Sequence, residues 1–455
     1  MSEERVPTGI TWLDQLIEGG FPSGSLILLA GNPGSGKTAF SVKFLCNGIQ
    51  SGEAGIYVSF AEGEETFLHN MTKHLGSEYE KYIKSEKFSF LDNITVKEEG
   101  ITSVLESILN EIQRLDAKRL VIDSYSALAQ AFENKINVRI VVHTILGKMV
   151  RKSGCTTIII SEVPRGQKQI GMGIEEFVAD GVILLKDIDV YEPSRDSDTY
   201  PEQTEVRTAR AMEIIKMRGT ELRQKRTLFT LKDGFQCFEP YRENLDMTPR
   251  AAVPDIDSEH VSSGIKDFDD ITGGFLKGSF NLFEIEYGVG RQYMEIIRQI
   301  QHNAILNNRG VLDIPSMGIP PSKKSSKNYL TYKPETEDIT KELEVFLQKD
   351  DLSKSETDKE PLVFIGLDTL QVRFGYDGMI RFIDEALDKK IAEEAVLIGV
   401  AKSGINQVDP FSHLSETQFV FKHLYNSLIM YGMRPKTGIY NISSHDEGIR
   451  LTPII

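Results

Sequence analysis

Residues 31–38, Gly-Asn-Pro-Gly-Ser-Gly-Lys-Thr, have the residue types and spacing of a phosphate-binding loop. Glycines let the backbone turn its N–H groups toward phosphate oxygens, and a helix that begins at the lysine adds a positive field. Lys37 is expected to contact the β- and γ-phosphates, and the Thr38 hydroxyl to ligate Mg²⁺. The predicted nucleotide contacts are Gly31, Asn32, Pro33, Gly34, Ser35, Gly36, Lys37, Thr38 and Ala39.

Carboxylates at the ends of apolar runs supply the remaining parts of a hydrolytic site. Asp123 ends the run 119–123 and is predicted to hold Mg²⁺ through water, as in a Walker B strand. Glu62 follows the run 55–60 and is the predicted positioner of the attacking water. Glu64 and Glu65 are rivals, although both suit the first turn of a helix.

The segment after the run 155–160 allows two interpretations. Ser161 and Glu162 could sense the γ-phosphate, or they could simply end a strand before the turn at Pro164. The residue pattern does not decide between them.

Lys216 and Arg218 form a second cationic candidate within the sequence Lys-Met-Arg-Gly-Thr at 216–220. Alternation along a strand places both cations on one face, which suits a triphosphate. An exposed edge strand explains the same spacing, and spacing alone favours that interpretation.

The elements that position these residues alternate between strand and helix. Apolar runs at 25–30, 55–60, 119–123 and 155–160 are separated by helical patterns at 64–74, 101–115 and 138–150. Continuous apolar strands joined by helices predict an α/β fold with a mostly parallel sheet covered on both faces. Beyond Gly181, the runs 182–185, 212–217 and 227–231 predict an antiparallel extension at the sheet edge.

The chain contains a second, altered copy of this pattern. Gly9 matches Gly264, and the glycine pair 19–20 matches 273–274. The sequence therefore predicts domains over 1–240 and 261–455, a linker over 241–260, and a polar insertion near 315–361 with a helix at 336–349 and mobile loop elsewhere. Alignment of the copies puts Arg291 opposite Lys37, Gln292 opposite Thr38, about Ser316 opposite Glu62, and Gly366 opposite Asp123. The second copy should not bind Mg²⁺-ATP productively, and Asp368 is the one candidate substitute carboxylate.

Composition limits the alternatives. The chain has 455 residues and a net charge of −15, which disfavours broad binding to nucleic acid. The opening residues carry no secretory signal pattern, and no apolar run approaches a membrane span. Cys46, Cys155 and Cys237 lack the pairing of a disulfide framework or zinc site, which predicts a reducing cytoplasm.

Taken together, these motifs resemble the KaiC-like branch of the RecA superfamily in its two-domain form. The resemblance implies two tandem RecA-like P-loop domains, hexameric rings and ATP with Mg²⁺ bound between neighbouring subunits. It makes Lys216 and Arg218 residues that act on the neighbour's γ-phosphate, with Thr220 a nucleotide contact. Two departures stand out: Ala61 replaces the first of two family carboxylates, and Leu222 replaces a family histidine.

Three functions fit the sequence. The first is an oligomeric ATPase that acts as a regulatory switch on an unidentified protein partner, with self-phosphorylation as a candidate activity. Its candidate acceptors are Ser194, Ser197, Thr199 and the loop 322–357. The second is a recombinase-like DNA-repair ATPase, which only the basic run 223–226 supports locally. The third is a non-hydrolysing regulatory module of the gas-vesicle type.

Overall fold

The computed structural model describes residues 4–75, 77–93, 101–126, 153–163, 178–192, 206–243, 251–318, 328–354, 359–403 and 408–455. The chain divides into two compact units. The first unit holds Met1–Val190, Thr208–Glu239 and Ile454–Ile455, and the second holds Tyr191–Arg207 and Pro240–Pro453. The predicted helix over 138–150 lies outside the described residues.

The first unit is built on a nine-stranded sheet in the order β11-β10-β9-β8-β3-β7-β6-β4-β5. The strands are β3 (Leu26–Gly31), β4 (Gly55–Ser59), β5 (Phe88–Asp92), β6 (Arg119–Asp123), β7 (Thr156–Glu162), β8 (Gly181–Tyr191), β9 (Val206–Met217), β10 (Arg226–Thr230) and β11 (Gln236–Cys237). β3 runs parallel to β7 and β8, whereas β10 is antiparallel to β9 and β11. The predicted α/β fold with an antiparallel edge is confirmed.

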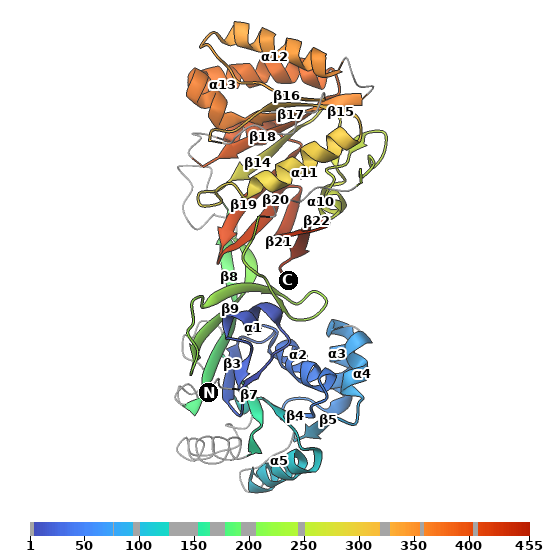
Figure 1. Cartoon of the computed structure of the whole chain (residues 1–455), viewed down its shortest axis with the longest axis vertical. Coiled ribbons are helices and arrows are strands. Elements are labelled where there is room, and N and C mark those ends of the chain that lie inside the picture. Colours follow the sequence, from blue (N-terminus) through green and yellow to red (C-terminus); the bar gives the residue numbers. More distant parts are fainter. Residues whose placement is uncertain are drawn as a thin grey trace. The chain divides into compact units, whose positions relative to one another are not determined.

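Helices cover this sheet because its central strands are apolar on both faces (Figure 1). The helices are α1 (Thr11–Leu16), α2 (Lys37–Gln50), α3 (Glu64–Leu75), α4 (Ser77–Ile83) and α5 (Ile101–Leu115). Ile27 and Leu29 of β3 pack with α2 in one core, while Leu28 packs with α5 in another. Alternate residues of β3 thus face opposite sides of the sheet, as the period of two along a strand requires.

The second unit repeats this architecture, with the order β16-β15-β17-β18-β14-β19-β20-β21-β22. Its strands are β14 (Phe280–Ile285), β15 (Arg309–Ile314), β16 (Tyr329–Thr331), β17 (Lys359–Gly366), β18 (Val396–Lys402), β19 (Thr417–Leu424), β20 (Ser427–Arg434), β21 (Lys436–His445) and β22 (Gly448–Pro453). The order β19-β14-β18-β17-β15-β16 matches β8-β3-β7-β6-β4-β5 strand for strand, so the two sheets are copies of one design.

The helices of the second unit are α10 (Lys266–Thr272), α11 (Tyr293–Leu306), α12 (Ile339–Lys354), α13 (Leu367–Ile391) and α14 (Asp409–Leu414). α11 packs into one core, and α12 and α13 pack together into the other (Figure 1). Each unit also has a short antiparallel pair before its first long strand: β1 (Arg5–Val6) with β2 (Phe21–Pro22), and β12 (His260–Val261) with β13 (Phe275–Leu276).

Within the polar stretch 315–361, the residues that the structure describes include a helix and a short strand. The helix predicted at 336–349 is α12, which begins and ends later, at Ile339 and Lys354. Residues 329–331 were expected to be loop but form β16, which pairs in parallel with β15. The reason is that Tyr329 and Leu330 pack against opposite cores of the sheet, which a polar neighbourhood in the sequence conceals.

Candidate functional site

The phosphate-binding loop joins the carboxyl end of β3 to the amino end of α2. Gly34 and Gly36 have φ angles of 78° and 94°, which residues with a Cβ rarely adopt. Lys37 begins the helix and is buried; its Nζ donates to the carbonyl oxygens of Gly31, at 3.0 Å, and Asn32, at 2.9 Å. Burial lowers the pKa of the Lys37 ammonium, while the charges of Glu162 and Asp123 raise it. A buried cation therefore lies within the loop that the motif predicts to surround phosphates.

Asp123 lies beside this loop at the carboxyl end of β6. Thr38 Oγ1 donates to Asp123 Oδ2 at 3.5 Å, and the Tyr57 hydroxyl donates to the same oxygen. Burial raises the pKa of the Asp123 carboxyl, an effect that the Tyr57 hydrogen bond and the Lys37 charge oppose. A hydroxyl and a carboxylate side by side are the hard oxygen donors that Mg²⁺ prefers, so these residues fit the ion. Tyr57 was missed by the sequence reasoning, because a tyrosine inside an apolar strand resembles an ordinary core residue.

Glu62 lies at the same sheet edge, just beyond β4. Ser59 Oγ accepts from the Glu62 N–H at 3.1 Å and donates to the Glu62 carbonyl at 2.6 Å, which fixes the backbone. Asn70 Nδ2 of α3 donates to Glu62 Oε2 at 3.1 Å, and burial raises the pKa of the Glu62 carboxyl. Glu64 and Glu65 are exposed in the first turn of α3. Hydrogen bonds thus hold Glu62 in place beside the loop, whereas Glu64 and Glu65 lie at the surface.

The Ser161–Glu162 pair divides between interior and site. Ser161 is fully buried within β7. Glu162 ends the strand directly opposite Gly31, and its charge acts on both Lys37 and Asp123. Ser161 therefore lies in the interior of the sheet, whereas Glu162 lies beside the phosphate-binding loop.

Arg210 of β9 also contacts the loop, and the sequence reasoning did not identify it. Its Nη1 donates to the carbonyl of Gly34 at 3.0 Å, and Asp187 lies 3.7 Å from the same nitrogen. One arginine in a long strand with several polar residues gives little signal, because only the pairing of strands brings it to the loop.

Lys216 and Arg218 lie at the opposite end of the sheet. Lys216 Nζ donates to the Ala179 carbonyl at 2.7 Å, and Arg218 Nη1 donates to Asp180 Oδ1 at 3.1 Å. Asp180 Oδ2 accepts from the N–H of Leu26, the first residue of β3. The loop begins at the other end of β3, about 17 Å away at roughly 3.3 Å per residue. These cations therefore do not reach their own loop.

Thr220 belongs to the same end of the sheet. Its Oγ1 accepts from Arg5 Nη1 at 2.8 Å. A shallow pocket of about 400 Å³ borders this region, lined by Pro22, Ser23, Gly24, Ser25, Gly154, Asp180, Arg218 and Gly219. The predicted site residues thus form two groups, one at each edge of the sheet.

The second unit has different residues at the corresponding places. Strand register puts Gly366 where β6 has Asp123, as the sequence alignment predicted. The loop after β14 is longer than the loop after β3. β3 ends at Gly31 and α2 begins at Lys37, whereas β14 ends at Ile285 and α11 begins only at Tyr293. Tyr293, not Arg291, therefore takes the helix position of Lys37, and the alignment of Lys37 with Arg291 and of Thr38 with Gln292 is corrected.

Charged groups surround Tyr293. Lys402 is the register counterpart of Glu162, and its Nζ lies 5.9 Å from the centre of the buried Tyr293 ring. Lys402 also pairs with Asp368 at 3.4 Å, and Asp368 Oδ2 accepts from the Met317 N–H at 2.9 Å. The carboxylate considered as a substitute metal ligand is thus engaged by a cation and a backbone amide.

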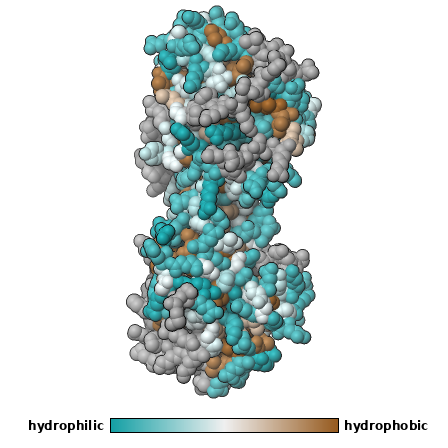
Figure 2. All heavy atoms as spheres, viewed as in Figure 1, coloured by the Kyte–Doolittle hydropathy of each residue, from teal (hydrophilic) through white to brown (hydrophobic). Residues whose placement is uncertain are grey.

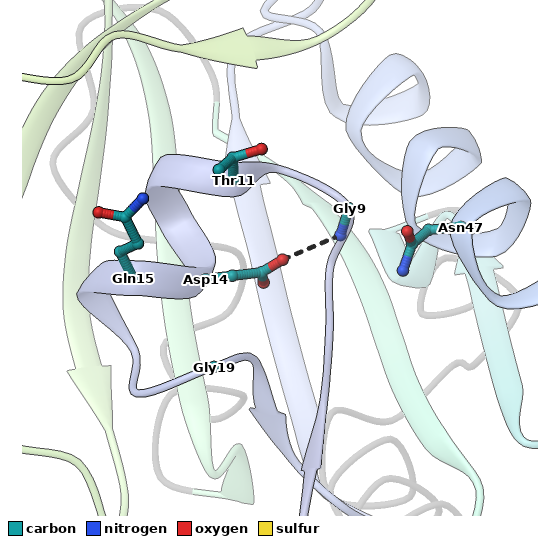
Figure 3. Close-up of a pocket in the computed structure, with 6 residues that line it drawn as sticks. All are labelled: Gly9, Thr11, Asp14, Gln15, Gly19 and Asn47. Carbon is teal, nitrogen blue, oxygen red and sulfur yellow. Dashed lines mark hydrogen bonds between the residues drawn. The ribbon is translucent and has the colours of Figure 1, made fainter. Parts of the chain in front are cut away.

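The glycine that opens each sequence copy has a structural explanation (Figure 3). Gly9 has a φ of 79°, a Cβ there would lie 2.7 Å from Asn47 Cβ, and its N–H donates to Asp14 Oδ2 at 3.2 Å. Gly264 has a φ of 78° and meets Asn303 in the same way. Gly9 also borders a shallow pocket of about 540 Å³, lined by Gly9, Thr11, Asp14, Gln15, Gly19 and Asn47. Gly9 and Gly264 are therefore explained by the local backbone conformation and by close packing against an asparagine in each unit.

The surface visible in Figure 2 is mostly hydrophilic, with small hydrophobic areas on each unit. In the part of the chain that the structure describes, each helix is too short or too polar to cross a bilayer. Cys46, Cys155 and Cys237 are free thiols.

Comparison with known proteins places these features in a family. The family profile described as "ATPase: KaiC" matches residues 6–237. The chain is 32% identical over 243 residues to UPF0273 protein PF1931 of Pyrococcus furiosus, in a match covering 50% of this chain and 91% of that protein.

The circadian clock oscillator protein KaiC of Prochlorococcus marinus is 30% identical over 322 residues, which cover 67% of this chain and 60% of that protein. The match therefore spans about 60% of that relative's length. A solved structure, the KaiC-like protein PH0186 of Pyrococcus horikoshii OT3, is 33% identical and aligns with a TM-score of 0.43, covering 52% of this chain and 100% of that chain. On the profile match and the identity to the Pyrococcus furiosus protein, the chain belongs to the KaiC family of ATPases.

Proposed function

We propose that the first unit binds Mg²⁺-ATP and hydrolyses it only when copies of the chain assemble. The proposal rests on the separation of the site residues. Lys37, Asp123 and Glu62 lie at the carboxyl ends of the parallel strands, whereas Lys216 and Arg218 lie at the opposite end of the sheet. A complete site then takes its loop from one copy and its two cations from the next. A ring closes such a head-to-tail contact, and the family resemblance suggests six copies.

In this site Lys37 binds the β- and γ-phosphates, while Thr38 and Asp123 hold Mg²⁺, which neutralises phosphate charge when bound. Glu62 orients a water molecule that attacks the γ-phosphorus, and the Glu62 carboxylate accepts a proton from that water. The bond between the γ-phosphorus and the β,γ-bridging oxygen breaks, and ADP leaves. The raised pKa of Glu62 favours that proton transfer. Arg218 of the neighbour stabilises charge on the transferring phosphoryl group, with Lys216 and Thr220 completing the contact.

We propose that the second copy, 261–455, has lost productive binding of Mg²⁺-ATP and serves as scaffold or partner surface, joined to 1–240 by the linker 241–260. The support is chemical. An uncharged tyrosine stands in place of the lysine, and a glycine in place of the metal carboxylate. Lys402 and Asp368 neutralise each other there.

The biological role we infer is a regulatory switch in the cytoplasm, in which hydrolysis changes contacts with an unidentified protein partner. Self-phosphorylation stays a candidate activity. Its proposed acceptors Ser194, Ser197 and Thr199 lie outside the described residues. Retained label after incubation with γ-labelled ATP and removal of free nucleotide tests it, and an unlabelled protein counts against it.

The DNA-repair alternative gains no support from the described residues. Arg226, in the basic run 223–226, pairs with Glu213 at 2.9 Å, so part of that charge is already neutralised. Salt-sensitive binding of single-stranded DNA with DNA-stimulated hydrolysis would revive it. A non-hydrolysing module is distinguished by a Lys37→Ala variant that keeps full biological activity.

The deciding experiment measures light scattering with and without ATP, together with hydrolysis, for the wild type and for Lys37→Ala, Glu62→Gln and Arg218→Ala. Each variant alone should lose hydrolysis by about two to four orders of magnitude. Mixing Glu62→Gln with Arg218→Ala should recover activity, because some interfaces then pair an intact loop edge with an intact Arg218. Glu64→Gln is the matched control and should behave as wild type. No recovery on mixing, or no hydrolysis by the wild type, defeats the proposal.

A further inference from the structure

Asp180 links Arg218 to the strand that carries the phosphate-binding loop. Its Oδ1 accepts from Arg218 Nη1 at 3.1 Å, and its Oδ2 accepts from the Leu26 N–H at 3.0 Å. Its own N–H donates to the Leu26 carbonyl at 2.7 Å. Two groups of Leu26, its N–H and its carbonyl, therefore hold Asp180 at the start of β3, and the other carboxylate oxygen, Oδ1, accepts from the arginine.

The arginine is held much less firmly. The Arg218 side chain is 54% exposed, whereas that of Asp180 is 13% exposed. An ion pair with one such exposed partner contributes little, because water and salt screen it. A bound polyphosphate carries several negative charges and accepts paired guanidinium hydrogen bonds, so it is the stronger partner for Arg218.

We propose that Asp180 is a positioning residue that holds Arg218 as its counter-ion. Arg218 leaves this carboxylate when it binds the phosphate of the nucleotide on a neighbouring copy. This inference rests on the proposed function, in which Arg218 acts between copies. Because Leu26 fixes Asp180, the carboxylate stays on β3 when Arg218 leaves. The exchange thus changes the charge at the amino end of the strand whose other end carries the chain's own loop.

Asp180→Asn tests the exchange, since the amide oxygen can still accept from Leu26 but no longer attracts or repels as an anion. The measurement is the Kd of a fluorescent, non-hydrolysable ATP analogue with Mg²⁺ for the assembled full-length chain. Removal of the competing anion should lower the Kd about two- to fivefold, the range expected for an exposed ion pair. Asp116→Asn is the matched control: Asp116 is exposed, pairs with Lys118 in the same unit, and should leave the Kd unchanged.

The effect must pass through Arg218. In an Arg218→Ala background, Asp180→Asn should leave the Kd unchanged, which a purely structural role would not produce. An unchanged Kd in Asp180→Asn, or an equal change in the Arg218→Ala background, overturns the inference while the proposed function stands. If Arg218→Ala itself alters neither hydrolysis nor the Kd, the proposed function fails and this inference fails with it. Asp180→Ala, which also removes the Leu26 acceptor, should lower the unfolding temperature and so separates loss of fold from loss of charge.

Discussion

Replacing Asp123 by asparagine should have opposite effects on the free and the nucleotide-bound protein. Burial raises the pKa of this carboxyl, so its ionised form carries a desolvation cost in the free protein. Asparagine keeps the shape and an acceptor for the Tyr57 hydroxyl but removes the charge. The free first unit should therefore keep or gain stability at pH 7. With Mg²⁺-ATP present the variant should lose stabilisation, because the metal has lost its carboxylate beside Thr38.

The size of the loss follows from mass action. A ligand at 100 times its Kd stabilises the folded state by about 2.7 kcal/mol, which is roughly 5–10 °C for a unit of this size. A contact to a charged group contributes about 1.5–3 kcal/mol, so its removal weakens binding about ten- to a hundredfold. At a hundredfold loss the same ligand concentration equals the Kd, and the shift falls to about 1 °C.

The chain supplies its own probe for this measurement. Trp12 is the single tryptophan and is buried in α1 of the first unit, so its fluorescence follows unfolding of that unit. Melting curves are recorded with and without a non-hydrolysable ATP analogue and Mg²⁺. The control is Asp92→Asn, an exposed carboxylate at the carboxyl end of β5, which should keep the full shift. A full Mg²⁺-dependent shift in Asp123→Asn would refute the assignment of this carboxylate to the metal.

Two further predictions concern stability. Burial raises the pKa of Asp313 in the second unit from 3.8 to about 6. The contribution of Asp313 to folding stability is therefore fully present below its unfolded pKa and is lost as the pH rises through about 6. Asp313→Asn should therefore stabilise that unit by up to about 3 kcal/mol above pH 6 and by little near pH 4, measured by urea unfolding with circular dichroism. Parallel pH profiles for variant and wild type would contradict this. Gly9→Ala should destabilise the first unit by about 1–3 kcal/mol through its positive φ and the clash with Asn47. Gly52→Ala, with a φ of 89° but no atom closer than 3.6 Å, should cost less by Trp12 fluorescence, and equal losses would exclude the clash as a cause.

Local sequence patterns predicted the parts of the site that are continuous in the chain. The loop 31–38 and the strand ending at Asp123 were evident because a P-loop needs fixed residues at fixed spacing and a central strand needs an unbroken apolar run. The α/β fold followed from the same strand and helix periods. Tyr57, Asn70 and Arg210 were not predicted, because each reaches the site from a different element and only strand pairing or helix packing joins them.

The sequence by itself determined which residue types stand in each copy, and from them it predicts that one copy keeps the chemistry of a nucleotide site and that the other has lost it. Only the tertiary structure decided how the retained parts are placed. Parallel strands bring Lys37, Asp123 and Glu62 to one edge of the sheet, while the antiparallel β9–β10 extension leaves Lys216 and Arg218 at the other. It likewise placed Tyr293 at the position of Lys37, because a longer loop shifts the start of a helix without changing the register of the strands beside it. Side-chain types are local properties of a chain, whereas the edge of a sheet at which they meet depends on how distant strands pair.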